Sequence, residues 1–119
     1  MRGLVHMNGA RLVHLMYAML YMTVGDAEEA RSIVLRLVEE GLVACGNIFP
    51  IQSIYRWKGK IEEEQEVAVI MKTRRELVEP AIAAAREAHS YEVPCVVAYA
   101  MEAGSEDYLR WIDTSTSVG

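Results

Sequence analysis

Apolar residues occupy both alternating sets of positions in the stretch "EVAVIMK", residues 66–72. If this stretch is a strand, Val67, Val69 and Met71 project from one face, and Ala68 and Ile70 project from the other. A strand with one face in water would alternate apolar with polar residues. The pattern therefore predicts a strand that is covered on both of its faces.

The same reasoning predicts four strands and three helices along the chain, with the second and third strands in direct succession. Gly25 and Gly41 bound the first helix, whose apolar residues recur at helical spacing. The "KGK" turn at residues 58–60 separates the second and third strands. The predicted strands are residues 14–24, 42–58, 63–72 and 95–101, and the helices follow Asp26, Thr73 and Ser105.

Each predicted helix begins at a residue suited to capping. Asp26 and Thr73 are each followed three residues later by a glutamate, as in a capping box, and Ser105 precedes two acidic residues. Pro80 lies inside the second helical pattern, so it either bends the first turns or moves the helix start to about residue 79.

The order β-α-β-β-α-β with a final helix indicates an α+β ferredoxin-like fold, the split βαβ plan, in a single domain over residues 14–119. Residues 1–13 are interpreted as an N-terminal extension. The two long helices can cover only one face of a four-stranded sheet, so the second apolar face predicts a homo-oligomer. The alternative is that the C-terminal helix and residues 1–11 fold over that face.

Composition narrows the class of protein. The chain has 119 residues, a net charge of −5 and 52% apolar residues, which is globular and argues against a nucleic-acid partner. Two cysteines, Cys45 and Cys95, cannot form a disulfide framework and suggest a reducing, cytoplasmic setting. The apolar run at residues 12–24 has no cleavage motif after it and is shorter than a membrane span, so we interpret it as a buried strand and expect no membrane partner.

Two long blocks of the chain resemble one known family. "SIYRWKG", "MKT", "YEVP" and "YLRWI" occur in the order and spacing typical of the CutA divalent-cation tolerance proteins, over roughly residues 15–113. The resemblance implies a ferredoxin-like subunit in a tight homotrimer, with a role in tolerance of divalent metals, mainly copper. It also implies a likeness to trimeric PII-type signalling proteins, which bind small ligands in clefts between subunits.

The family's copper-binding pattern is only partly present. It places a cysteine near the end of the first strand, where this chain has Met22, and a histidine pair, of which only His89 is present. Cys45 matches a cysteine common in the family. Sulfur and imidazole ligands suit copper, which is the one cofactor that we expect. The alternatives are that Cys45 is a small buried residue and that His89 favours a helix C-terminus.

A second group of residues combines aromatic rings with charges near strand ends and in one loop. Such groups can orient a small ligand in a cleft, or can form a subunit interface instead. The acidic run "IEEEQE", residues 61–66, is interpreted as a solvated hairpin tip. The group consists of Tyr55, Arg56, Trp57, Lys72, Tyr91 and Glu92.

No motif indicates an enzyme. The chain has neither a Ser/His/Asp order nor a glycine-rich phosphate loop. We therefore expect a non-enzymatic homotrimer of the CutA type that acts in copper tolerance. The alternatives are a PII-like sensor of a small molecule and a structural scaffold without a ligand.

Overall fold

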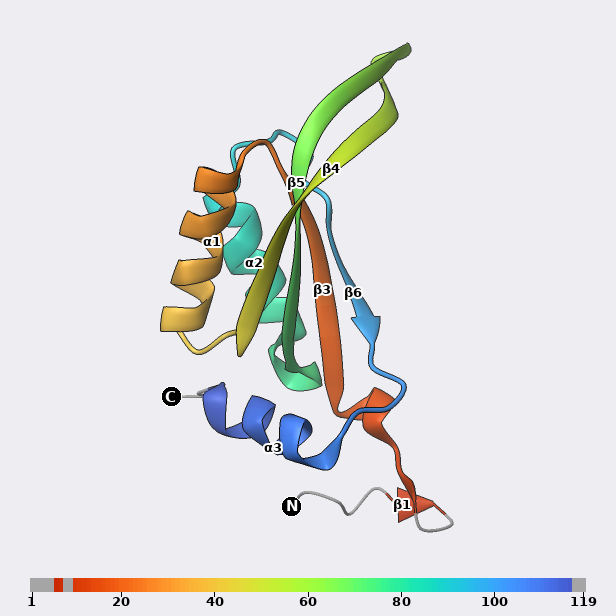
Figure 1. The fold of residues 1–119 in the computed structure, drawn as a ribbon, viewed down its shortest axis with the longest axis vertical. Coiled ribbons are helices and arrows are strands. Elements are labelled where there is room, and N and C mark those ends of the chain that lie inside the picture. The colour runs from red at the N-terminus through yellow and green to blue at the C-terminus, as the bar shows by residue number, and fades with distance from the viewer. Residues whose placement is uncertain (1–5, 8–9, 117–119) are drawn as a thin grey trace.

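The computed structural model describes residues 6–7 and 10–116, and these form one four-stranded sheet, a short two-stranded sheet and three α-helices (Figure 1). Two short 3₁₀ helices, Val13–Leu15 and Arg75–Leu77, precede β3 and α2. The elements are β1 His6–Met7, β2 Ala10–Arg11, β3 Tyr17–Val24, α1 Ala27–Glu39, β4 Cys45–Trp57, β5 Lys60–Arg74, α2 Val78–Ala88, β6 Val96–Ala100 and α3 Glu106–Ser115.

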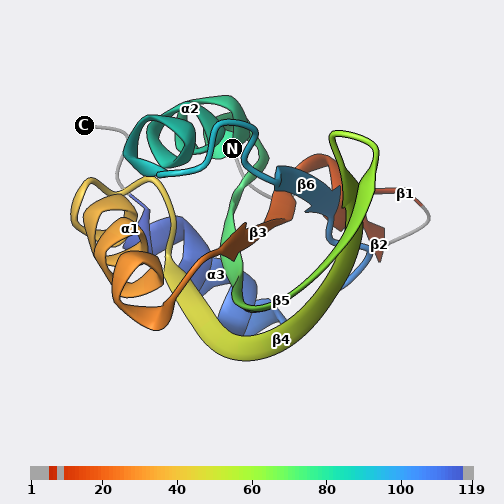
Figure 2. The same ribbon diagram turned by 90° about the horizontal axis from the view of Figure 1, so that it is seen from above.

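The large sheet has the strand order β4-β5-β3-β6, and every neighbouring pair is antiparallel. β3 and β6 are the first and last strands of the βαββαβ unit and lie side by side, as the ferredoxin-like plan requires. Helices α1 and α2 cover the same face of this sheet (Figures 1 and 2). The predicted α+β architecture and the order of its elements are therefore confirmed.

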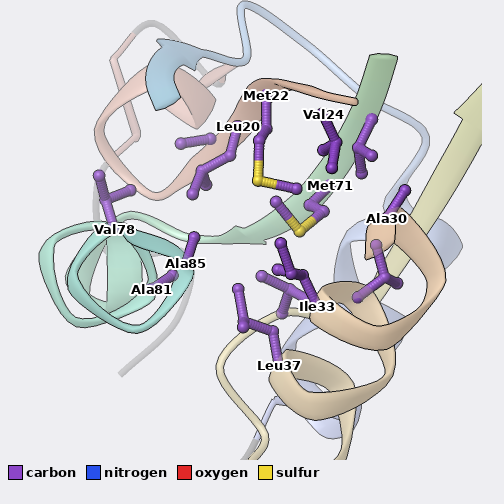
Figure 3. Close-up of a cluster of buried hydrophobic side chains, with 14 residues drawn as sticks. Leu20, Met22, Val24, Ala30, Ile33, Leu37, Met71, Val78, Ala81 and Ala85 are labelled. Atoms are coloured by element: carbon purple, nitrogen blue, oxygen red, sulfur yellow. The ribbon is translucent and has the colours of Figure 1, made fainter. Parts of the chain in front are cut away.

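The helix-covered side of the sheet, called the helix face here, forms the main core. Leu20 and Met22 of β3 and Met71 of β5 are fully buried on it, and they meet side chains of α1 and α2 (Figure 3). α1 contributes large residues such as Ile33 and Leu37, whereas α2 contributes mainly alanines. The small residues of α2 allow its backbone to approach the sheet closely.

The opposite side of the sheet, called the open face here, is only partly covered in a single chain. It is formed by Tyr21, Thr23, Phe49, Ala68, Ile70, Val97 and Tyr99, which the strand register places on one side. Phe49, Val97 and Tyr99 are 36%, 42% and 58% exposed. α3 does not cover these residues. It packs at the end of the sheet in a second cluster with Val13, Tyr17 and Ala44.

The prediction that Thr73 caps the second helix was wrong, whereas the alternative start at about residue 79 is confirmed. Thr73 lies within β5, where its hydroxyl donates a hydrogen bond to the carbonyl of Leu42 at 2.7 Å. The chain continues through a 3₁₀ turn, and α2 begins at Val78, with Pro80 in its first turn. Asp26 does cap α1, since its carboxylate accepts from the Glu29 N–H at 2.8 Å. Ser105 occupies the N-cap position of α3 without a side-chain capping bond.

The β4–β5 hairpin extends well beyond the other strands (Figure 1). The pairing of β5 with β3 ends at Val67, so residues 60–66 pair with β4 alone. The two-residue turn has positive φ at Lys58 (51°) and Gly59 (83°), which suits the right-handed twist of a hairpin. The third strand is thus longer than the predicted 63–72.

The N-terminal segment lies partly outside the described residues, so its interpretation as an extension remains a prediction. Its described part contains the antiparallel pair β1–β2. Within the part of the chain that the structure describes, no helix is long and apolar enough to cross a membrane.

Candidate functional site

A cavity of about 610 Å³ lies where the extended hairpin faces the loop between α2 and β6. We call it the hairpin pocket. Five of the six residues predicted to form a cleft line it, together with two glutamates, a threonine, a valine and a cysteine. The lining residues are Thr23, Tyr55, Arg56, Trp57, Glu64, Glu66, Tyr91, Glu92, Val93 and Cys95.

The register of the hairpin places the pocket's key side chains on one side of it. Tyr55 and Trp57 have the same parity on β4, and their side of the ladder includes Glu64 and Glu66 of β5. The Tyr55 hydroxyl donates to Oε1 of Glu64 at 2.5 Å. The two strands therefore present aromatic rings and carboxylates together toward the pocket.

The loop after α2 contributes Tyr91, whose hydroxyl donates to Oε2 of Glu66 at 2.6 Å. Glu66 is only 8% exposed, although it belongs to the acidic run that was interpreted as a solvated tip. That interpretation was wrong for Glu66. The local sequence could not reveal its burial, because the covering tyrosine comes from 25 residues away.

His89 holds this loop in place. Its ring Nδ1 accepts from the Tyr91 N–H at 3.1 Å, so the neutral ring carries its proton on Nε2, which lies 2.7 Å from the Thr23 carbonyl. The imidazole is fully buried, and the nearest carboxylate oxygen, of Glu29, is 3.8 Å from Nδ1. Both ring nitrogens are thus already used within the chain. The alternative that His89 only favours a helix C-terminus does not account for these two hydrogen bonds.

The environment of the two tyrosines favours their neutral, donating form. The hydrogen bond to Glu64 raises the pKa of Tyr55 to about 12, with smaller effects from burial and neighbouring carboxylates. Burial, followed by the hydrogen bond to Glu66, raises the pKa of Tyr91 well above that of a free phenol. Both hydroxyls therefore remain donors across the physiological pH range.

The three residues predicted to bind metal do not converge within one chain. Met22 is fully buried in the core on the helix face. Cys45 pairs with Lys72, which pairs with Met19, so the register places its side chain on the other side of the sheet from Met22. Among the residues described, no group of three or more His, Cys, Asp or Glu side chains could hold a metal ion.

Cys45 lies instead beside the C-terminal helix. Its Sγ is 3.6 Å from the Tyr108 hydroxyl, and the Tyr108 ring packs against Trp111 with a centroid distance of 5.4 Å. Burial and this contact raise the pKa of Tyr108 to about 12. Cys45 is a partly buried free thiol, which is compatible with both of the roles considered for it.

Lys72 is the one predicted cleft residue that does not line the hairpin pocket. Its Nζ donates to Oδ1 of Asn47 at 2.5 Å, on the sheet beside Cys45. Conversely, five lining residues were not predicted from the sequence: Thr23, Glu64, Glu66, Val93 and Cys95. Strand parity would have placed both glutamates on the Tyr55 side of the hairpin.

Comparison with known proteins agrees with the fold and the motifs. Residues 18–115 match the model of the family "CutA1 divalent ion tolerance protein". The chain is 44% identical over 98 residues to the "Divalent-cation tolerance protein CutA" of Archaeoglobus fulgidus, covering 82% of this chain and 96% of that one. It is 40% identical to the "Protein CutA, chloroplastic" of Arabidopsis thaliana over 81% of this chain and about half (53%) of that one.

A solved structure gives the same result in three dimensions. The "Periplasmic divalent cation tolerance protein CutA" from Archaeoglobus fulgidus superposes with a TM-score of 0.82 and 43% identity, covering 84% of this chain and 98% of that one. The fold defines this chain as an α+β protein with a four-stranded antiparallel sheet. The chain belongs to the CutA divalent ion tolerance family.

The relatives do not share a single location. One is named as periplasmic and another as chloroplastic. The cytoplasmic location expected from the cysteine content therefore stays a prediction.

Proposed function

We propose that this chain acts in divalent-cation tolerance as a non-enzymatic homotrimer, with copper as its main cation. The observation that supports the cellular role is the match of residues 18–115 to a family named for tolerance of divalent ions. Deleting the gene in its host should increase sensitivity to copper, and a plasmid copy should restore growth. Unchanged growth in copper, zinc and cadmium would contradict the proposed role.

The homotrimer is supported by the open face. Exposed aromatic and branched side chains on one side of a sheet form a patch of the kind that a second copy of a chain covers. Light scattering of the purified protein should give about three times the chain mass of 13.4 kDa. A stable monomer at micromolar concentration would contradict this part of the proposal.

Direct copper binding should be modest and selective for Cu(I). Thioether and imidazole ligands favour Cu(I), but His89 could bind a metal only by giving up one of its two hydrogen bonds. A competitive Cu(I) titration of the wild type, His89→Ala and Cys45→Ser tests the assignment. We expect His89→Ala to lose most of the binding, and a loss confined to Cys45→Ser would make Cys45 the ligand instead.

A second candidate function is a small-molecule sensor of the PII-like kind. The specific observation in its favour is the hairpin pocket, in which five residues predicted to form a cleft lie around one cavity of about 610 Å³. Cavities of this size hold metabolite-sized ligands. A panel of metabolites should contain a compound that raises the melting temperature of the wild type but not of Trp57→Ala. A panel without such a compound would favour the scaffold hypothesis.

A further inference from the structure

Within the described part of the chain, the carboxylates of the hairpin pocket have no positively charged partner. Glu64 and Glu66 each accept a hydrogen bond from a tyrosine hydroxyl, at 2.5 and 2.6 Å. Among the described residues, no lysine, arginine or histidine nitrogen forms an ion pair with either one. A phenol hydroxyl stabilises a carboxylate by a hydrogen bond but does not neutralise its charge.

For Glu66, the lack of a positively charged partner is energetically unfavourable because the carboxylate is buried. The residue is more than nine-tenths buried, and its Oε2 accepts from Tyr91. In the part of the chain that is described, its second oxygen, Oε1, has no hydrogen-bond donor. A buried carboxylate that retains its charge normally has a cation or several donors beside it. Oε1 of Glu66 can therefore accept a hydrogen bond from a positively charged donor.

Arg56 lines the same cavity, but none of the described ion pairs joins it to Glu66. The register opposes Arg56 to Ile61 and places its side chain on the other side of the hairpin from Tyr55 and Glu64. Its guanidinium lies near the turn, with Nη1 at 3.4 Å from the Gly59 carbonyl. Lys60, opposite Trp57, is on the pocket side of the hairpin but does not line the cavity, and none of the ion pairs of the described residues joins it to Glu64 or Glu66.

The remaining pocket walls suit an organic cation better than a metal ion. Tyr55, Trp57 and Tyr91 supply aromatic rings, whose faces attract ammonium groups. Lys58 Nζ already lies over the Trp57 ring, 5.5 Å from its centroid, so a ligand would meet the other face of that ring. A hard divalent ion would require six or more converging oxygens, and within the described part of the chain no group of three or more acidic, cysteine or histidine side chains converges.

We propose that the hairpin pocket binds a small organic cation, an alkylated ammonium, between the carboxylates of Glu64 and Glu66 and the rings of Tyr55 and Trp57. This inference rests on the second candidate function, because it names the chemical class of the ligand for that site. The carboxylates supply charge, the rings supply a polarisable apolar wall, and the 610 Å³ cavity sets the upper size.

The test is an NMR titration of the full-length protein in its native assembly, at constant ionic strength. The probe is tetramethylammonium, and tert-butanol is a neutral control of similar shape. We expect a saturable shift of the Trp57 indole N–H with tetramethylammonium and none with tert-butanol. Equal responses to both compounds, or no response to tetramethylammonium, would overturn the proposal.

Three variants identify the charges responsible. Glu64→Gln and Glu66→Gln remove a charge, while the amide oxygen can still accept from the tyrosine. Each should weaken binding by about tenfold or more. Glu63→Gln is the matched control, because Glu63 opposes Ile54 on the other side of the hairpin and lies outside the pocket lining. It should change affinity by less than about twofold, and a loss equal to that of Glu64→Gln would overturn the proposal.

Two further outcomes separate this inference from the proposed sensor function. If a neutral or anionic metabolite binds in a manner abolished by Trp57→Ala while tetramethylammonium does not bind, the sensor stands and the cation class is wrong. If no compound binds and Glu66→Gln reduces the trimer mass in light scattering, a basic side chain of a second copy pairs with the Glu66 carboxylate. That result overturns the free ligand and the sensor together.

Discussion

The two faces of the central sheet carry similar residues in very different surroundings. On the helix face, Met22 and Val69 are fully buried beneath α1 and α2. On the open face, the adjacent Tyr21 and Ile70 lie on the side where Val97 and Tyr99 remain largely exposed. Both sets of alternating positions in the strands are apolar, yet the described helices α1 and α2 cover only one of the two faces.

This difference shows that an apolar pattern specifies burial without specifying what does the burying. A helix of the same chain and a neighbouring copy exclude water equally well. The two faces should therefore respond differently to the same substitution. Charge on the helix face should prevent folding, and charge on the open face should prevent assembly.

Val69→Glu should have the largest effect. The new carboxylate would lie without a partner in the core, at a position that is now fully buried. Leaving a charge unpaired in a core costs about 3–5 kcal/mol, against a total stability of roughly 5–15 kcal/mol. Circular dichroism should show loss of the cooperative unfolding transition or a large drop in its midpoint. An unchanged midpoint would mean that the helix face is not the core.

Ile70→Glu should separate assembly from folding. Ile70 is partly buried and lies between Tyr21 and Asn47 on the open face. We expect light scattering to report monomers and circular dichroism to retain the secondary structure. A trimer of unchanged mass and melting temperature would show that the open face is solvated, and the contrast between the two faces would then fail.

Gly46→Ala sharpens the comparison at the edge of the helix face. A Cβ at this position would lie 2.7 Å from Cγ1 and 3.1 Å from Cγ2 of Val34, so the Val34 side chain or the α1 helix that carries it would have to move. Overpacking of this kind costs about 1–3 kcal/mol, measurable by urea denaturation. Gly25→Ala is the matched control, since its nearest atom, the Tyr91 hydroxyl, is 3.4 Å away. Equal losses in both variants would point to backbone conformation as the cause.

The smallest expected effect concerns Tyr55, on the continuation of the open face along the hairpin. Glu64→Gln should lower the pKa of Tyr55 from about 12 toward the ordinary value near 10, because the hydrogen bond to Glu64 is the main cause of the shift and a neutral amide oxygen accepts more weakly than a carboxylate. The raised pKa of this phenol stabilises the fold below pH 10, and the contribution disappears as the pH rises through about 12. NMR titration of labelled tyrosines measures the change.

Glu62→Gln is the control for this titration. Glu62 pairs directly with Tyr55 across the hairpin but has the weakest effect on the pKa among the causes identified. It should produce a clearly smaller decrease than Glu64→Gln. A decrease of the same size would show that overall negative charge, and not the hydrogen bond, raises the pKa of Tyr55.

Local patterns predicted the elements well and their junctions less well. The Asp26 cap and the turn at Lys58 and Gly59 depend on neighbouring residues, and the structure confirms both. Thr73 followed by Glu76 has the same local signature as Asp26 followed by Glu29. It is no cap, because its hydroxyl instead satisfies the carbonyl of Leu42, a residue 31 positions away.

The candidate pocket was also predictable only in part from local patterns. Aromatic and charged residues near strand ends indicated a cleft or a subunit interface, and five of them line one cavity. The metal hypothesis grouped residues by their match to the family's copper-binding pattern and by ligand chemistry. Met22 and Cys45 are on opposite sides of the sheet, a relation that depends on strand register and that no ligand motif specifies.

The sequence by itself determined the order of strands and helices, the two apolar faces and the family. The order and the faces follow from spacing along the chain, which sets the side of an element that a residue occupies, and the family follows from the resemblance of its motifs. Only the tertiary structure decided which groups meet. It placed Tyr91 on Glu66, used both ring nitrogens of His89 and left two carboxylates facing a cavity. These contacts join segments distant in the chain, and their geometry depends on how the hairpin and the loop pack in space.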